Sequence, residues 1–169
     1  MAISLKTSIG TPTANSYVSI ASADDYFNRR YDSDAWLDLL TEASTSTLSG
    51  TDQKAALLIQ STREIDRTFR FYGSKENSGL LGASDYQNLE FPRYNDTDAD
   101  GTSIIRENIQ EATCEQAIWL LQRSDVQTSS DETTVKQPKF SAMGYDLLKK
   151  IVQRSVDSVG KYPWQGSKY

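Results

Sequence analysis

The sequence predicts a mainly α-helical protein: a small helical bundle with short β elements, a long irregular connection and an extended C-terminal arm. Two stretches, near residues 53–70 and 103–123, have apolar residues at helical spacing. A Gly-, Asn- and Asp-rich stretch over 74–102 separates them. A chain of 169 residues is long enough for one domain with a buried core.

The elements before the first long helix are short. Residues 15–20 alternate in a β-like manner, and residues 22–25 (Ser-Ala-Asp-Asp) match a capping box that begins a short helix. A second helix start at Ser33 precedes a tryptophan and leucines at helical spacing. A Ser/Thr-rich loop follows, and Thr51 or Asp52 is the predicted cap of the next helix.

Two longer helices give the strongest pattern. In the first, which Gly73 closes, one stripe holds Ala55, Leu58, Thr62, Ile65 and Phe69. In the second, the apolar face holds Ile105, Ile109, Ala112, Thr113, Ala117, Leu120 and Leu121. The connection between them carries an aromatic island from Tyr86 to Tyr94. Because long structureless loops are uncommon in compact domains, we expect this segment to be functional or packed by its own side chains.

The C-terminal part differs in composition. Residues 125–137 read as a linker, residues 140–159 as a helix, and residues 160–169 as an aromatic, basic segment that orders against a partner. We therefore expect a helical domain over 1–130, followed over 131–169 by a linker, a C-terminal helix and a partner-binding arm.

Charge is unevenly distributed along the chain. Residues 1–132 carry 11 Lys and Arg against 21 Asp and Glu, a net charge of −10. Residues 133–169 carry 7 against 2, a net charge of +5, and the two parts sum to the −5 of the whole chain. This asymmetry indicates attraction between copies or towards another acidic surface, or else a solvated final helix with lysines outside.

Several function classes are disfavoured by what the sequence lacks. Without histidine the chain cannot form a Ser-His-Asp or Cys-His site, and Cys114 alone cannot form an intrachain disulfide. Its apolar runs are too short to span a membrane, and its first ten residues do not resemble a signal peptide. We expect a soluble protein made in the cytoplasm, with no enzymatic activity and no cofactor.

One segment fits the spacing of an EF-hand calcium loop. Asp96, Asp98, Asp100 and Glu107 occupy loop positions 1, 3, 5 and 12, and Gly101 occupies position 6. The residues before it contain a proline and no helical stripe, although a true EF-hand needs an incoming helix. The alternative is an acidic Asp-Gly turn that leads into a capped helix, so this set is a weak metal candidate.

Two segments interleave basic and aromatic residues, as single-stranded nucleic-acid binding requires. They are residues 67–72 (Arg-Thr-Phe-Arg-Phe-Tyr) and residues 161–165 (Lys-Tyr-Pro-Trp-Gln). The net negative charge of the first 132 residues opposes such binding, because affinity for phosphates comes from positive charge. Phe69 is also explained by the helix core.

An ordered set of segments carries a family resemblance. The set consists of Asn15–Tyr26 with Trp36, Lys54–Asp66 with Gly73, Gln87–Arg93 with Asp100-Gly101, and Glu111–Ala117. It resembles the head–tail connector, or adaptor, proteins of tailed phages, some of whose members carry a DnaT-like single-stranded DNA-binding label. The resemblance covers about residues 15–123.

The resemblance implies a structural virion protein at the head–tail interface, or neck. Copies would form a ring, usually of twelve, that extends the DNA channel beneath the portal and meets tail or stopper proteins. DNA would pass an acidic channel without specific binding, and no membrane would be involved. The predicted partner-binding residues in the arm are Lys149, Lys150, Arg154, Lys161, Tyr162 and Trp164. The alternative is a replication accessory protein that binds single-stranded DNA.

Overall fold

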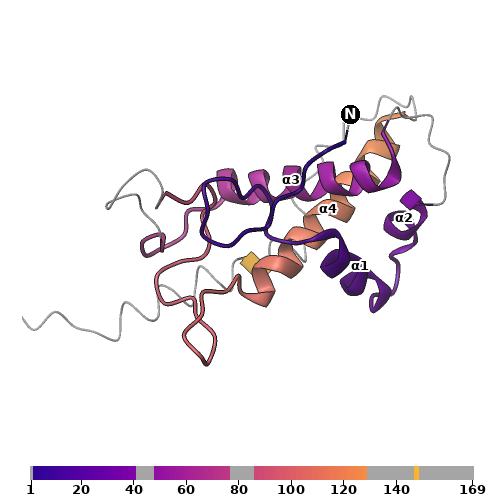
Figure 1. The fold of residues 1–169 in the computed structure, drawn as a ribbon. Helices are drawn as coiled ribbons and strands as arrows, with labels where there is room; N and C mark the ends of the chain where they lie inside the picture. The colour runs from indigo at the N-terminus through magenta and orange to yellow at the C-terminus, as the bar shows by residue number, and fades with distance from the viewer. Residues whose placement is uncertain (1, 41–47, 77–85, 129–146, 149–169) are drawn as a thin grey trace, which may run out of the picture.

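Helices dominate the computed structural model, which describes residues 2–40, 48–76, 86–128 and 147–148. They are α1 (Ile20–Asn28), α2 (Asp34–Leu37), the 3-10 turn η1 (Asp38–Leu40), α3 (Gly50–Thr68) and α4 (Glu107–Thr128). The two long helices, α3 and α4, pack against each other, and α1 and α2 cover one end of the pair (Figure 1). This arrangement confirms the predicted mainly α fold.

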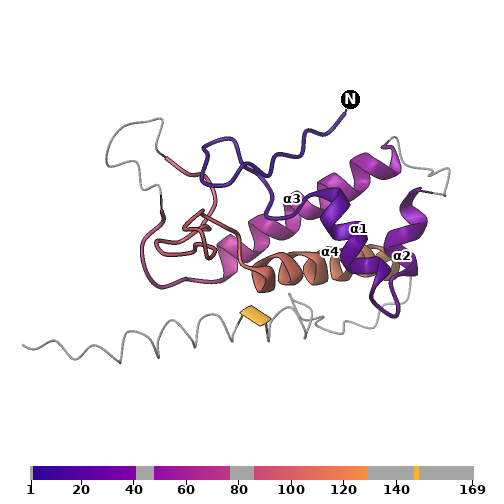
Figure 2. The same ribbon diagram turned by 60° about the horizontal axis from the view of Figure 1, so that its bottom comes forward.

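The irregular segment lies at the opposite end of the helix pair from α2. Figures 1 and 2 both show residues 86–106 folded beyond the point where α3 ends. Within the described residues, β structure is confined to two isolated bridges, Lys75 with Arg93 and Thr97 with Ser103. The β-like stretch predicted over 15–20 forms no strand: it bends at Tyr17 and Val18 and enters α1 at Ile20. The amides of Asn15 and Ser16 both donate to the Lys6 carbonyl, at 2.9 and 3.2 Å.

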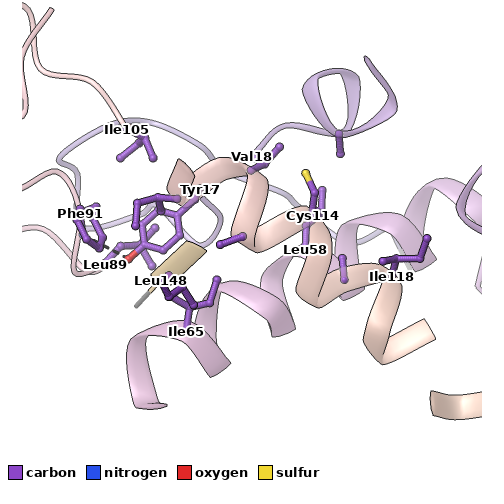
Figure 3. Packing of buried hydrophobic residues seen from close by; sticks show 14 of the residues in the cluster. Tyr17, Val18, Leu58, Ile65, Leu89, Phe91, Ile105, Cys114, Ile118 and Leu148 are labelled. Carbon is purple, nitrogen blue, oxygen red and sulfur yellow. Dashed lines mark hydrogen bonds between the residues drawn. The ribbon is translucent and has the colours of Figure 1, made fainter. Parts of the chain in front are cut away.

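The core forms along the line where α3 meets α4. The predicted α3 stripe is buried at Ala55, Leu58, Thr62 and Ile65, while Phe69 is only partly buried. From α4, the side chains of Ile109, Ala112, Thr113, Ala117 and Ile118 complete this layer. Figure 3 shows Tyr17, Leu89 and Phe91 grouped near Ile65, so the irregular segment contributes to the same core.

The helix starts differ from the predicted ones. Ser19, and not Ser22, caps α1: its hydroxyl accepts a hydrogen bond from the Ser22 amide at 3.1 Å. Ser49, and not Thr51 or Asp52, caps α3: it accepts from the Asp52 amide at 3.2 Å and donates to the Asp52 carboxylate at 2.9 Å. In both helices, a serine two or three residues before the predicted position forms the cap.

The ends of both long helices also differ from expectation. The α3 helix ends at Thr68 rather than at Arg70, so Gly73 lies in the following turn with a φ of 84°. The α4 helix begins at Glu107 because Ser103 pairs with Thr97 and the Ile104 amide donates to the Asp96 carbonyl at 2.9 Å. It continues to Thr128, into the stretch predicted as a linker.

A small described part of the C-terminal region joins the helical domain. Leu147 and Leu148 form a short helical piece, and the Leu148 side chain is fully buried in the core cluster. The rest of the predicted linker, C-terminal helix and arm lies outside the described residues. The chain therefore returns to the helical domain after residue 146.

Candidate nucleic-acid interface

The irregular segment, residues 86–106, is held against α3 by a buried tyrosine and a carboxylate on that helix. The Tyr17 hydroxyl donates to the Asp66 carboxylate and accepts from the amides of Glu90 and Phe91 at 3.1 and 3.3 Å. The Glu90 amide also donates to Asp66 at 3.2 Å. Burial raises the pKa of Asp66 to about 6, and burial beside Asp66 raises the pKa of Tyr17 as well. This cluster fixes residues 89–91 against the C-terminal half of α3.

A short antiparallel pairing then sets the outer part of the segment. Lys75 pairs with Arg93, and the Tyr94 amide donates to the Ser74 carbonyl at 3.0 Å. The Gln87 side-chain amide donates to the carbonyls of Leu89 and Pro92, both at 3.0 Å. Within the described residues, the loop is therefore held in part by its own Gln87 side chain, in line with one of the two alternatives that the sequence left open.

Three arginines are exposed along the end of α3 and just beyond it. Arg63 and Arg67 are four residues apart on α3 and therefore lie on one side of the helix. Arg70 follows two residues after the helix ends at Thr68. None of the three forms an ion pair with a residue in the described part of the chain. The nearby carboxylate of Glu64 instead accepts from Gln116 on α4 at 2.6 Å. Within the described residues, the three arginines are thus left without an ion-pair partner.

Exposed tyrosines continue from this row of arginines. Tyr72 is 56 % exposed, Tyr86 48 % and Tyr94 70 %. All three belong to the segment organised by the pairing of Lys75 with Arg93, and the Lys75 ammonium lies 5.9 Å from the centre of the Tyr86 ring. We define the arginine–tyrosine surface as these six residues: Arg63, Arg67, Arg70, Tyr72, Tyr86 and Tyr94.

The structure separates the aromatic residues of the 67–72 motif into two roles. Phe69 and Phe71 are partly buried, and the Phe71 ring packs against that of Phe91 with centroids 4.7 Å apart. Tyr72 is the exposed member of the motif. The basic–aromatic motif in the sequence includes Arg67, Arg70 and Tyr72 but not Arg63, whose spacing of four residues from Arg67 was the available signal. Tyr86 and Tyr94 stand out in the sequence only as the ends of the aromatic island.

Most other cations of the helical domain are engaged internally. Arg30 pairs with Glu115 at 2.7 Å, Lys54 with Asp24 at 2.7 Å, and Lys75 with Glu90 at 3.1 Å. Two further pairs join Arg93 to Glu90 and Arg106 to Asp96. These five cations add little free positive charge to the surface, which makes the arginine–tyrosine surface distinct.

The four carboxylates with EF-hand spacing have other roles. Asp96 accepts from the Arg106 guanidinium and, at 2.9 Å, from the Arg93 amide. Asp98 accepts from the amides of Asp100 and Thr102 at 3.0 and 2.8 Å, which closes its own turn, and Glu107 begins α4. Among the described residues, no group of three or more potential metal-binding side chains gathers at one point. The Asp-Gly turn interpretation fits these contacts.

The structure does not place the predicted partner-binding residues relative to this surface. Lys149, Lys150, Arg154, Lys161, Tyr162 and Trp164 all lie outside the described residues. The interleaved 161–165 segment lies there too. Within the described ranges, no helix is long and apolar enough to cross a membrane.

The fold and this surface define a small helical protein whose exposed arginines and tyrosines suit contact with a negatively charged ligand that contains aromatic rings. The chain belongs to the family described as "Putative DnaT-like ssDNA binding protein", whose model matches residues 1–143. The comparisons with curated proteins and with solved structures gave no match. The family agrees with the DNA-binding label noted in the resemblance, and the phage connector role stays a prediction.

Proposed function

We propose that this protein binds single-stranded DNA through the arginine–tyrosine surface. One observation carries the proposal: Arg63, Arg67 and Arg70 are exposed and form no ion pair with any described residue, and the exposed Tyr72 follows them in the chain. Guanidinium groups neutralise phosphates, and tyrosine rings stack on bases of any sequence. The family description names the same ligand.

The arrangement favours a single strand over a duplex. Bases must be unstacked to reach a tyrosine ring, and each base–aromatic stack contributes about 1–3 kcal/mol. The backbone of the segment that carries Tyr86 and Tyr94 is anchored through Tyr17 and Asp66. The segment therefore loses little conformational entropy on binding. We expect little sequence preference, since every base offers a stacking face.

The acidic character of the domain sets the strength of binding. If the three arginines without a described ion pair each neutralise one phosphate, the expected slope of log affinity against log salt is about −2, from roughly −0.7 for each phosphate. Binding should be weak, because the surrounding carboxylates repel phosphate, and its fall with rising salt should be modest.

Fluorescence anisotropy with a labelled oligo-dT 20-mer and the full chain tests this proposal. The combined Arg63→Ala, Arg67→Ala and Arg70→Ala variant should lose most of its affinity and nearly all of its salt dependence. Arg29→Ala is the matched control, since Arg29 is an exposed arginine on α1 outside the surface, and it should bind like wild type. Equal binding by the triple variant and the control would refute the proposal.

The second candidate is a ring-forming adaptor between a phage portal and tail. Two observations favour it: the ordered segments that resemble head–tail connectors, and the net charge of −10 over residues 1–132, which would let DNA slide past. The resemblance implies a ring of twelve copies, and such self-association needs a head-to-tail interface that closes. Mass photometry and negative-stain imaging of the full chain, alone and with a portal, test this candidate. A monomer under both conditions would count against it.

A further inference from the structure

A groove of about 530 Å³ lies between α1 and the first turns of α4, away from the arginine–tyrosine surface. Its floor includes Val18, the Tyr26 ring and the buried Cys114. Its polar rim is formed on one side by Ser22, Asp25, Arg29 and Arg30, and on the other by Glu107, Gln110 and Glu111.

The charge of this groove is negative. Arg30 is neutralised by Glu115, which lies 2.7 Å away and also accepts from the Tyr26 hydroxyl at 2.6 Å. The three rim carboxylates form no ion pair with any described residue. Three carboxylates against Arg29 leave a net charge of about −2 on the rim.

The carboxylates also lie close enough to disfavour one another. The pKa of Glu111 is raised, first by partial burial and then by the negative charges of Glu107 and Glu115. The positive end of the α4 dipole offsets part of this repulsion, since the helix begins at Glu107. A cation placed in the groove would offset the remaining repulsion between the carboxylates. The apolar floor would accept an aromatic ring or the aliphatic part of a lysine side chain.

The chain itself carries a segment of complementary chemistry. Residues 149–169 contain Lys149, Lys150, Arg154, Lys161 and Lys168 against the single Asp157, together with Tyr162, Trp164 and Tyr169. This segment begins directly after Leu148, which is buried in the core, and Figures 1 and 2 place residues 147–148 beside the first turns of α4. At about 3.3 Å per extended residue, 21 residues can reach about 70 Å, more than enough to arrive at the groove.

We propose that the groove between α1 and α4 binds the chain's own C-terminal segment, residues 149–169. Lysine and arginine side chains of the segment contact Asp25, Glu107 and Glu111, and an aromatic ring packs on the floor formed by Val18 and Tyr26. Tethering through Leu148 makes this binding intramolecular and gives the segment a high effective concentration at the groove. An acidic partner would compete with the groove for the same basic residues.

Zero-length carbodiimide cross-linking of the full chain, followed by mass spectrometry, tests the contact directly. The reagent joins a carboxylate to a lysine ammonium only when the two are in contact. We expect links from the segment's lysines to Asp25, Glu107 or Glu111 and few links to Asp98 or Asp100, which are exposed elsewhere. Cross-linking a mixture of ¹⁵N-labelled and unlabelled chains distinguishes links within one copy from links between two copies. Groove links between differently labelled copies would overturn the intramolecular proposal. The absence of any groove link would overturn it too.

Limited trypsin cleavage after Lys161 gives a second readout that does not depend on the cross-linker. Glu107→Gln combined with Glu111→Gln should increase the rate of this cleavage about fivefold, because two ion pairs to the segment are lost. Asp34→Asn combined with Asp100→Asn removes the same charge from exposed sites outside the groove and should leave the rate unchanged. Equal rates in the two double variants would overturn the proposal, whatever the DNA-binding assays show.

Discussion

Replacing Asp24 with alanine should lower the free energy of unfolding more than almost any other single change to a partly exposed residue. Asp24 on α1 accepts from the Lys54 ammonium on α3 at 2.7 Å and from the Trp36 indole on α2 at 2.8 Å. The Lys54 side chain is 0 % exposed, whereas Asp24 is 29 % exposed. The Lys54 ammonium also lies 5.2 Å from the centre of the Trp36 ring. One carboxylate thus joins three helices.

The size of the effect follows from what remains after the carboxylate is removed. An unpaired buried charge costs about 3–5 kcal/mol, and an unpaired indole N–H adds about 1–3 kcal/mol. Water can enter the space left by a partly exposed side chain, so we expect a total near the lower end of the summed range, about 4–5 kcal/mol. Lys54→Met removes the charge but keeps the volume and the bond between Trp36 and Asp24, so it should cost only about 1 kcal/mol.

Urea unfolding followed by circular dichroism measures both free energies, provided that the slope with denaturant is unchanged. The double variant Asp24→Ala/Lys54→Met should be more stable than Asp24→Ala alone, since the stranded charge is gone. Asp100→Ala is the matched control, because that carboxylate is exposed and makes no ion pair in the described chain; it should change stability by less than about 0.5 kcal/mol. If Asp24→Ala behaves like Asp100→Ala, the three-helix ion pair does not stabilise the fold.

Two further predictions concern buried ionisable groups. The pKa of Asp66 is raised to about 6 in the folded protein, so the folded state holds this proton more tightly than the unfolded chain, and the stability that it provides at low pH is lost as pH rises from about 4 to 6. Asp66→Asn cannot titrate, so the difference in free energy of unfolding between the variant and wild type should shift in favour of the variant by up to about 3 kcal/mol between pH 4 and pH 7. Urea unfolding at both pH values measures this difference, and an equal difference at both would contradict the prediction. Cys114 is 1 % exposed and burial raises its pKa to about 12, so its thiol should not react with a disulfide reagent at pH 8 until urea unfolds the chain. Rapid labelling of the native protein would contradict this.

Helices with a regular apolar stripe could be predicted from the sequence, and the contacts that join them could not. The positions of Leu58 and Ile65 on one face of α3 follow from the helical period alone. The pairing of Lys75 with Arg93 and the bond from Glu90 to Asp66 connect residues that no local period relates. Helix caps failed for a different reason: Ser19 and Ser22 both satisfy the capping pattern, and only the packing around them selects one.

The candidate surface was predictable in part for the same reason. Interleaved arginines and aromatics drew attention to residues 67–72, but the sequence does not reveal which aromatic side chains turn inward. Phe71 turns towards Phe91, and Tyr72 stays exposed. Charge was misleading when it was summed over the domain, because it does not show which cations are already paired. With five other cations in internal ion pairs, Arg63, Arg67 and Arg70 remain as a local positive site at the C-terminal end of α3 on an acidic protein.

This row of arginines also separates the two candidate functions. In a DNA-binding protein, Arg63, Arg67 and Arg70 contact phosphates, so their replacement by alanine lowers DNA affinity and leaves the molecular mass in solution unchanged. In a ring-forming adaptor, the same exposed arginines are free to meet the acidic surface of the next copy, so their replacement changes the mass distribution and leaves DNA affinity unchanged. Mass photometry and anisotropy on the one triple variant therefore give opposite results for the two functions. An effect of the variant in both assays would mean that DNA binding depends on assembly.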